Sequence, residues 1–233
     1  MWLIAEYQPV TLFSFRSGMA TSSGAKTLFL PTPFAIRTAL LDAAIRTRGI
    51  AAGSAVFEWL KKLRIAVRLP ERVVVTNLFA KVLKPTRKDK KNKPQKKEEP
   101  MERTIAFREY AYLDGTLTLA FETEGDRADE LRLLLTQLNY FGKRGSFFQL
   151  LRAPESTDVL PEGFIAMDDI ESTFVLGSII QPMDDWGESM TFAKVNIYID
   201  EEISLGEDRV RKNMVLPYRL VRSSKSFSYY ERM

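Results

Sequence analysis

The sequence contains neither cysteine nor histidine. Without cysteine, disulfide scaffolds, zinc ribbons and thiol catalysis are excluded. Without histidine, the chain lacks the usual general base near neutral pH, every Ser–His triad and the commonest ligand of transition metals. Any chemistry would have to use carboxylates, Lys, Tyr, Arg or a Mg²⁺ ion, and we expect no cofactor and no metal site.

Long apolar runs are missing too, since none approaches the roughly 20 residues that span a bilayer. The first six residues lack a basic region, and Glu6 interrupts them early, so they predict a first strand rather than a signal peptide. We therefore expect a cytoplasmic protein without membrane contact. With 233 residues, 45% of them hydrophobic, the chain can bury one sizeable core or two small ones.

The positive charge is concentrated in one segment. Residues 84–97 carry eight Lys and Arg against Asp89 alone, a net +7, whereas the whole chain has a net charge of +4. The segment contains no apolar residue that could pack, so we expect a solvated excursion at about residues 84–100. It is either a solubilising surface loop or an arm that neutralises phosphates.

Hydrophobic periodicity and turn residues predict a βαββαβ pattern in residues 1–152. Thr32 should cap a helix that starts with Pro33, and Gly49 should end it. Asp114-Gly115 is typical of a type I′ hairpin. The predicted strands cover 2–15, 72–83, 104–112, 116–122 and 146–151. Besides the helix from Pro33, Ser54 should cap a second helix with Val56, Leu60 and Leu63 buried, and Asp126 should cap a third that ends by Gly142.

This order is typical of an α+β, ferredoxin-like (RRM-like) domain with a long hairpin whose tip is basic. Residues 153–233 form a β-rich C-terminal extension, with strands expected at 172–180, 191–200 and 214–220. Asp184-Asp185 and residues 200–202 make poor metal cages, because adjacent carboxylates on a strand point to opposite faces.

Three segments combine cations with residues that let a backbone approach phosphate. They are the Gly/Ser-rich loop 16–26, the basic tip, and residues 139–146 (NYFGKRGS), where Gly142 and Gly145 flank Lys143 and Arg144 between aromatic residues. A second, looser basic set follows near the C-terminus and either contacts RNA or is ordinary surface charge. The candidate RNA-binding residues are Arg16, Ser17, Lys26, Lys84, Arg87, Lys88, Lys90, Lys91, Gly142, Lys143, Arg144, Gly145, Arg209, Arg211 and Lys212.

The opening strand, residues 28–34 (LFLPTPF) and residues 139–146 together resemble the CRISPR-associated RAMP proteins. Within them the match is to the fifth numbered Cas family, which caps the five-prime handle of the guide RNA in type I Cascade complexes. The resemblance covers roughly the first 150 residues.

The resemblance implies that residues 84–97 form the tip of a thumb hairpin over the guide RNA. The loop 16–26 and the turn Gly142 to Gly145 would line the path of the handle. The implied partners are CRISPR guide RNA, the Cascade backbone and large subunits and, indirectly, target DNA. In one type I subtype the family cuts precursor guide RNA with a site resembling a Tyr, Lys and His set, and this chain has no His.

Three functions remain open from the sequence. The leading one is a non-catalytic RNA-binding subunit of a guide-RNA effector complex, with no catalytic residue. The second is an endoribonuclease that processes CRISPR repeat RNA, which the absence of histidine disfavours. The third is a protein-interaction module of ferredoxin-like fold, which the glycines around Lys143 and Arg144 disfavour.

Overall fold

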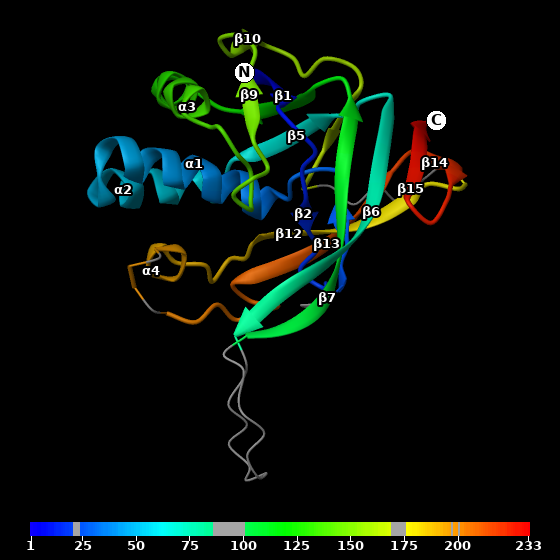
Figure 1. Ribbon diagram of the computed structural model, residues 1–233. Coiled ribbons are helices and arrows are strands. Elements are labelled where there is room, and N and C mark those ends of the chain that lie inside the picture. The colour runs from blue at the N-terminus through cyan, green and yellow to red at the C-terminus, as the bar shows by residue number, and fades with distance from the viewer. Residues whose placement is uncertain (21–23, 86–100, 169–175, 197, 200) are drawn as a thin grey trace, which may run out of the picture.

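The computed structural model describes all residues except 21–23, 86–100, 169–175, 197 and 200. Two sheets, one group of helices and a two-stranded ladder surround a shared hydrophobic core (Figure 1). The mixed α and β composition expected from the sequence is confirmed. Within the described residues, no helix is both long and apolar enough to cross a membrane.

The first sheet has the order β10–β1–β8–β5–β11, with β9 paired to β1 beside β10, and every pair is antiparallel. Strand β8 is central and its first five residues are buried, because β1 and β5 flank it in the sheet and helices cover one face. The strands are β1 (Trp2–Pro9), β5 (Arg64–Arg68), β8 (Leu117–Glu122), β9 (Phe148–Leu150), β10 (Glu155–Thr157) and β11 (Phe164–Ala166).

Three helices pack against this sheet: α1 (Pro33–Arg48), α2 (Ile50–Leu60) and α3 (Asp126–Thr136). Thr32 caps α1 as predicted, because its Oγ1 accepts a 3.2 Å hydrogen bond from the backbone N–H of Ala35. Gly49 ends α1 at φ +87°, a conformation that favours glycine. The Tyr7 hydroxyl of β1 donates to the carbonyl of Leu135, which fixes α3 on the sheet.

The second sheet has the order β14–β15–β6–β7–β3. Its main feature is the hairpin of β6 (Arg72–Pro85) and β7 (Met101–Asp114), which pair in register from Arg72↔Asp114 to Pro85↔Met101. The end of this hairpin projects away from the body of the molecule (Figure 1). The other strands are β3 (Gly24–Ala25), β14 (Tyr218–Ser223) and β15 (Phe227–Arg232).

A ladder of β12 (Ile179–Trp186) and β13 (Arg209–Leu216) packs next to α1, and the short helix α4 (Phe192–Val195) lies between them in the chain. A small pair, β2 (Phe15–Arg16) and β4 (Thr27–Leu28), encloses the loop that contains residues 21–23. Residues beyond 152 thus supply strands to both sheets as well as the ladder.

Several predicted boundaries in the first 152 residues were wrong. The first strand ends at Pro9 rather than residue 15. The second helix begins at Ile50, so Ser54 lies inside it, and it ends at Leu60; Leu63 precedes β5, a strand that the sequence reading missed. Helix α3 has Gly125 at its N-cap position in place of Asp126, and it ends at Thr136, before Gly142.

The prediction of a hairpin at Asp114-Gly115 was also wrong. Strand β7 pairs with β6, whereas β8 pairs with β1 and β5, so this turn carries the chain from one sheet to the other. In the C-terminal region, the predicted strand 172–180 falls partly outside the described residues, and β12 starts at Ile179. The predicted strand 191–200 contains α4 instead, and 214–220 is divided at Pro217 between β13 and β14.

Candidate nucleic-acid interface

A cleft of about 720 Å³ opens between α1, the turn after Tyr140 and the β12–β13 ladder. Its walls combine apolar side chains of α1 with cations from four segments of the chain, α1 among them. We refer to this space as the cleft. It is lined by Phe15, Arg16, Thr32, Phe34, Ala35, Thr38, Ala39, Leu41, Asp42, Ile45, Arg46, Tyr140, Gly142, Lys143, Arg144, Asp184, Val195, Asn196, Tyr198 and Arg209.

Five candidate residues from the sequence meet in this cleft: Arg16, Gly142, Lys143, Arg144 and Arg209. They come from β2, from the turn before β9 and from β13, which lie far apart in the sequence. The sequence predicted the first four as neighbours of an RNA path and gave Arg209 only as part of a looser set. Their convergence is the main observation at this site.

The turn at Gly142 to Gly145 presents two cations to solvent. Gly142 and Gly145 have φ values of +64° and +101°, which side chains with a Cβ rarely adopt. The backbone N–H of Ser146 donates to the carbonyl of Lys143 at 3.1 Å and closes the turn. Lys143 and Arg144 are both exposed, so packing does not account for their presence.

A buried carboxylate holds the arginines of β13 in place. Asp184, whose side chain is 4% exposed, accepts hydrogen bonds from Arg209 Nη2 at 2.6 Å and from Arg211 Nε at 2.9 Å. The Arg209 guanidinium also lies 4.5 Å from the centroid of the Phe34 ring. The carboxylate and the ring fix its orientation at the cleft wall.

The loop after β2 packs onto the same ion cluster. A Cβ on Gly18 would lie 2.7 Å from Asp184 Oδ2 and 3.0 Å from Arg211 Nη2, so only glycine fits without displacement. The backbone N–H of Ser17 donates to the carbonyl of Lys26 at 3.3 Å, and Arg16 Nη2 donates to the carbonyl of Ala20 at 2.8 Å. The contact at Gly18 therefore sets where Arg16 enters the cleft.

The remaining candidates do not line the cleft. Ser17 is buried in the loop, Lys26 is exposed outside the cleft, and Lys84 lies near the far end of β6. Gly145 and Arg211 lie next to lining residues without being part of the wall. Arg87, Lys88, Lys90 and Lys91 lie outside the described residues.

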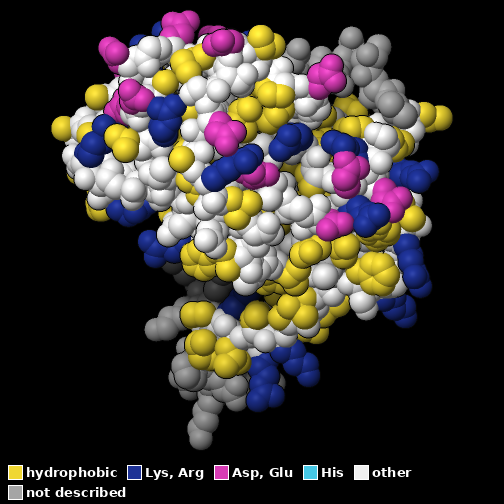
Figure 2. All heavy atoms as spheres, turned by 90° about the horizontal axis from the view of Figure 1, so that it is seen from above, with side chains coloured by type: hydrophobic (Ala, Val, Ile, Leu, Met, Phe, Trp, Pro, Cys, Tyr) yellow, Lys and Arg dark blue, Asp and Glu magenta, His cyan; other side chains and the backbone are white. Residues whose placement is uncertain are grey.

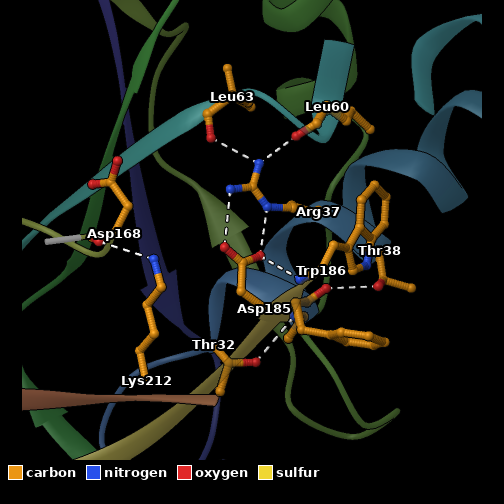
Figure 3. Close-up of polar contacts among 11 residues, drawn as sticks. Thr32, Arg37, Thr38, Leu60, Leu63, Asp168, Asp185, Trp186 and Lys212 are labelled. Atoms are coloured by element: carbon orange, nitrogen blue, oxygen red, sulfur yellow. Dashed lines mark hydrogen bonds and ion pairs between the residues drawn. The ribbon is translucent and has the colours of Figure 1, made fainter. Parts of the chain in front are cut away.

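Lys212 makes a different contact. Its Nζ donates to the backbone carbonyl of Asp168 at 3.2 Å (Figure 3), and it is not part of the cleft wall. Along β13, Lys212 alternates with Arg209 and Arg211, which both reach Asp184. The three cations that look alike in the sequence thus face different partners.

Sequence reasoning missed Arg46, Tyr140 and Tyr198 as parts of the site. Arg46 lies near the end of α1, where its Nη2 donates to the carbonyl of Gln137 at 2.9 Å and its Nε lies 3.5 Å from Asp42. Tyr140 belongs to the 139–146 motif, so an aromatic ring beside Gly-Lys-Arg-Gly was the available signal. For Tyr198, which is 74% exposed, the sequence offered none.

The segment that carries Tyr198 is held by a buried ion pair. Lys194 Nζ lies 2.5 Å from Asp208 Oδ2, and the backbone N–H of Ser204 donates to the same oxygen at 2.8 Å. These two hydrogen bonds lower the pKa of Asp208 to about 2. Asn196 Oδ1 accepts a hydrogen bond from the backbone N–H of Tyr198 at 3.1 Å, which fixes the backbone that carries the Tyr198 ring.

Arg37 holds β12, the strand that carries Asp184, through its contact with Asp185 (Figure 3). Its guanidinium binds both oxygens of Asp185, at 2.7 and 3.3 Å, and donates to the carbonyls of Leu60 and Leu63. Asp184 and Asp185 therefore point to opposite sides of β12, as predicted from their adjacency. The described residues contain no cluster of His, Cys, Asp and Glu suited to a metal ion.

The exposed face of the first sheet is an unsuitable place for RNA. Its cations are engaged: Arg64 binds Glu122 and Asp168, and Arg152 binds Glu6. Phe164 lies under Arg68 and packs against a small cluster on this face. Trp2 is buried on this face, and Arg68 lies over the partly buried ring of Phe164, which leaves little ring surface for base stacking.

No family model matches the chain. A curated protein of Archaeoglobus fulgidus named CRISPR-associated protein Cas5 is 28% identical over 193 residues, which cover 81% of each chain. Two solved structures are similar at 15% identity. One, titled CRISPR RNA-guided surveillance complex, has a TM-score of 0.48 with 92% of this chain and 90% of that chain covered. The other, titled Crystal structure of Cas protein, has a TM-score of 0.40, with 92% of this chain and 94% of that chain covered.

The resemblance of the sequence motifs to the fifth numbered Cas family is confirmed by a curated relative of that name.

Proposed function

We propose that this chain is the Cas5-type subunit of a type I CRISPR effector complex and binds the five-prime handle of the guide RNA without cutting it. It would also anchor the backbone and large subunits of the Cascade complex. The similarity to a relative named CRISPR-associated protein Cas5 supports the class of protein. The cleft supports the binding role.

The observation that carries the proposal is the convergence of cations on the cleft. Arg16 of β2 and the turn residues Lys143 and Arg144 line it, and Arg209 and Arg46 complete the wall. Both lining carboxylates, Asp42 and Asp184, already bind arginines. The surplus positive charge suits phosphates, and the rings of Tyr140 and Tyr198 suit unstacked bases.

The β6–β7 hairpin supports the thumb role. Its two arms stay paired up to Pro85 and Met101, so the basic residues 86–100 connect the ends of the projecting hairpin. A polycation at this place would neutralise phosphates of an RNA strand that passes the hairpin. We propose that this segment contacts the guide RNA beside the backbone subunit.

The strand order supports a ferredoxin-like reading of the first sheet. The order β9–β1–β8–β5, with α1 and α2 between β1 and β5 and with α3 between β8 and β9, is the order that a βαββαβ domain adopts. In this reading β5, rather than residues 72–83, is the second strand. The β6–β7 hairpin is then an insertion between the second and third strands.

A gel-shift experiment tests this function. Labelled CRISPR repeat RNA and a scrambled RNA of equal length are titrated with the protein, and each sample is also run under denaturing conditions. We expect tighter binding of the repeat RNA, with both RNAs intact. Equal weak binding of both RNAs would reject the handle-binding role.

Matched variants connect the result to the cleft. Arg16→Ala/Lys143→Ala should weaken binding of the repeat RNA about tenfold or more, because each charged contact to phosphate contributes substantially. Lys62→Ala/Arg127→Ala removes the same charge from exposed positions outside the cleft and should leave binding within about twofold.

A second candidate is an endoribonuclease, and one observation favours it: Tyr140 and Lys143 line the same cleft. Either side chain could act on a 2′-hydroxyl without a metal ion. Cleavage of repeat RNA at one position on the denaturing gel, abolished by Lys143→Ala, would replace the binding-only proposal with this one.

A further inference from the structure

The outer face of the second sheet carries four aromatic side chains in two neighbouring rows. One row runs Tyr229–Val74–Tyr112 across β15, β6 and β7, and the next runs Phe227–Thr76–Tyr110. We call Tyr110, Tyr112, Phe227 and Tyr229 the aromatic face. Their side chains share one side of the sheet because cross-strand partners point the same way.

The side chains of the aromatic face point away from the core. On the other side of the same strands, Val73 and Val75 are buried, with 0% and 5% of their surface exposed, and Tyr230 packs against the core. Tyr112 is 49% exposed, and the other three rings of the aromatic face are partly exposed. Four rings that reach solvent on adjacent strands are more than core packing requires.

Beside the aromatic face, the carboxylates of the adjacent row are paired with arginines, whereas one exposed arginine forms no ion pair within the described residues. At one end Arg72 and Arg219 bind the only two carboxylates of the adjacent row, Asp114 and Glu231. Arg222, opposite Tyr229 on β14, is exposed and forms no ion pair within the described residues. On the lower right of Figure 2, hydrophobic side chains form a band, with Lys and Arg as well as Asp and Glu at its borders.

We propose that the aromatic face binds a single strand of nucleic acid by stacking unpaired bases on its rings, with Arg222 against the backbone. Aromatic rings that stack bases beside cations that meet phosphates are the usual components of sequence-tolerant binding to single strands. The occupied carboxylates leave a surface that attracts a polyanion.

This site is separate from the cleft. None of the residues lining the cleft belongs to β6, β7, β14 or β15, and the core lies between this sheet and α1. A strand on the aromatic face would therefore be bound in addition to the RNA in the cleft. The inference does not rest on the function proposed for the cleft.

The test measures binding of a labelled single-stranded 20-mer, as RNA and as DNA, by fluorescence anisotropy over a series of salt concentrations. The full chain is used with the cleft intact and, in parallel, with Arg16→Ala/Lys143→Ala. In the Arg16→Ala/Lys143→Ala background, where the cleft no longer dominates, Tyr112→Ala/Tyr229→Ala should weaken binding about tenfold or more, because each stacked base contributes to affinity. The salt dependence should stay unchanged, since no phosphate contact is removed.

Tyr112→Phe/Tyr229→Phe keeps both rings and should bind within about twofold of the parent, which separates stacking from folding. Arg222→Ala should instead reduce the salt dependence by about 0.7 in log–log slope. Retained affinity in the Tyr→Ala pair, with an unchanged melting temperature, would overturn the proposal and leave the face to a protein partner. Loss of affinity in the Tyr→Phe pair would overturn stacking as the cause.

Discussion

Arg37 of α1 and Asp185 of β12 form a bidentate ion pair that is almost fully buried. Arg37 Nε lies 2.7 Å from Asp185 Oδ1, and the two side chains are 6% and 14% exposed. The same guanidinium donates to the carbonyls of Leu60 and Leu63, where α2 gives way to β5. One residue thus joins α1, the end of α2 and the ladder that carries Asp184.

Breaking this pair should destabilise the whole fold. Asp185→Ala leaves the Arg37 charge buried and uncompensated, so we expect a loss of about 3–5 kcal/mol in the free energy of unfolding. Asp129→Ala breaks an ion pair whose carboxylate is 84% exposed and should cost at most about 1 kcal/mol. Urea denaturation of both variants measures the difference, and equal losses would contradict this role of Arg37.

The structure separates two cations of β13 that the sequence grouped together. Arg209→Ala removes a guanidinium at the cleft wall, so it should weaken binding of repeat RNA and lower the salt dependence by about 0.7 in log–log slope. Lys212→Ala removes a cation bound to the carbonyl of Asp168 and should leave both quantities unchanged. The affinity of each variant for repeat RNA is measured at four salt concentrations. Equal effects of Arg209→Ala and Lys212→Ala would show that β13 contributes only general positive charge.

The pair Lys194–Asp208 predicts a pH dependence of stability. The native pKa of Asp208, about 2, lies below the usual value of an aspartate near 4. Its contribution to stability is therefore complete above about pH 4 and is lost as the pH falls through 2. Asp208→Asn should be less stable than the parent at pH 7, and the gap should close between pH 4 and pH 2. A gap that stays constant over this range in thermal melts would contradict the assignment.

Shortening the hairpin tests the basic segment. Because Pro85 and Met101 are paired, residues 86–100 can be replaced by a short Gly-Asn turn without changing the register of β6 and β7. If the segment engages about five phosphates of single-stranded RNA, the log–log salt slope should fall in magnitude by about 3.5. An unchanged slope would remove the proposed thumb contact.

The sequence predicted those elements whose signals are local. Thr32, Pro33 and Gly49 define α1 through capping and backbone conformation, so its ends could be located without a structure. The Asp114-Gly115 turn shows the limit, because a turn residue does not say which strands its neighbours will pair with. The pairing of β7 with β6 follows from long-range packing.

The same division holds for the cleft. Lys143 and Arg144 could be chosen because the glycines beside them are adjacent in the chain. The arrangement of Arg209 between Asp184 and Phe34 joins residues that are 25 and 175 positions apart, and no local pattern encodes it. Arg211 and Lys212 reach different partners because they alternate along β13, but the sequence predicted no strand at these two residues.

The most direct test of the central claim is photo-crosslinking of the protein to repeat RNA that contains 4-thiouridine in its handle, followed by mass spectrometry of the linked peptides. The account predicts crosslinks to the cleft wall, above all at Tyr140, Lys143 and Tyr198, and their loss in Arg16→Ala/Lys143→Ala but not in Lys62→Ala/Arg127→Ala. RNA that remains bound and crosslinks only to residues outside the cleft would contradict it.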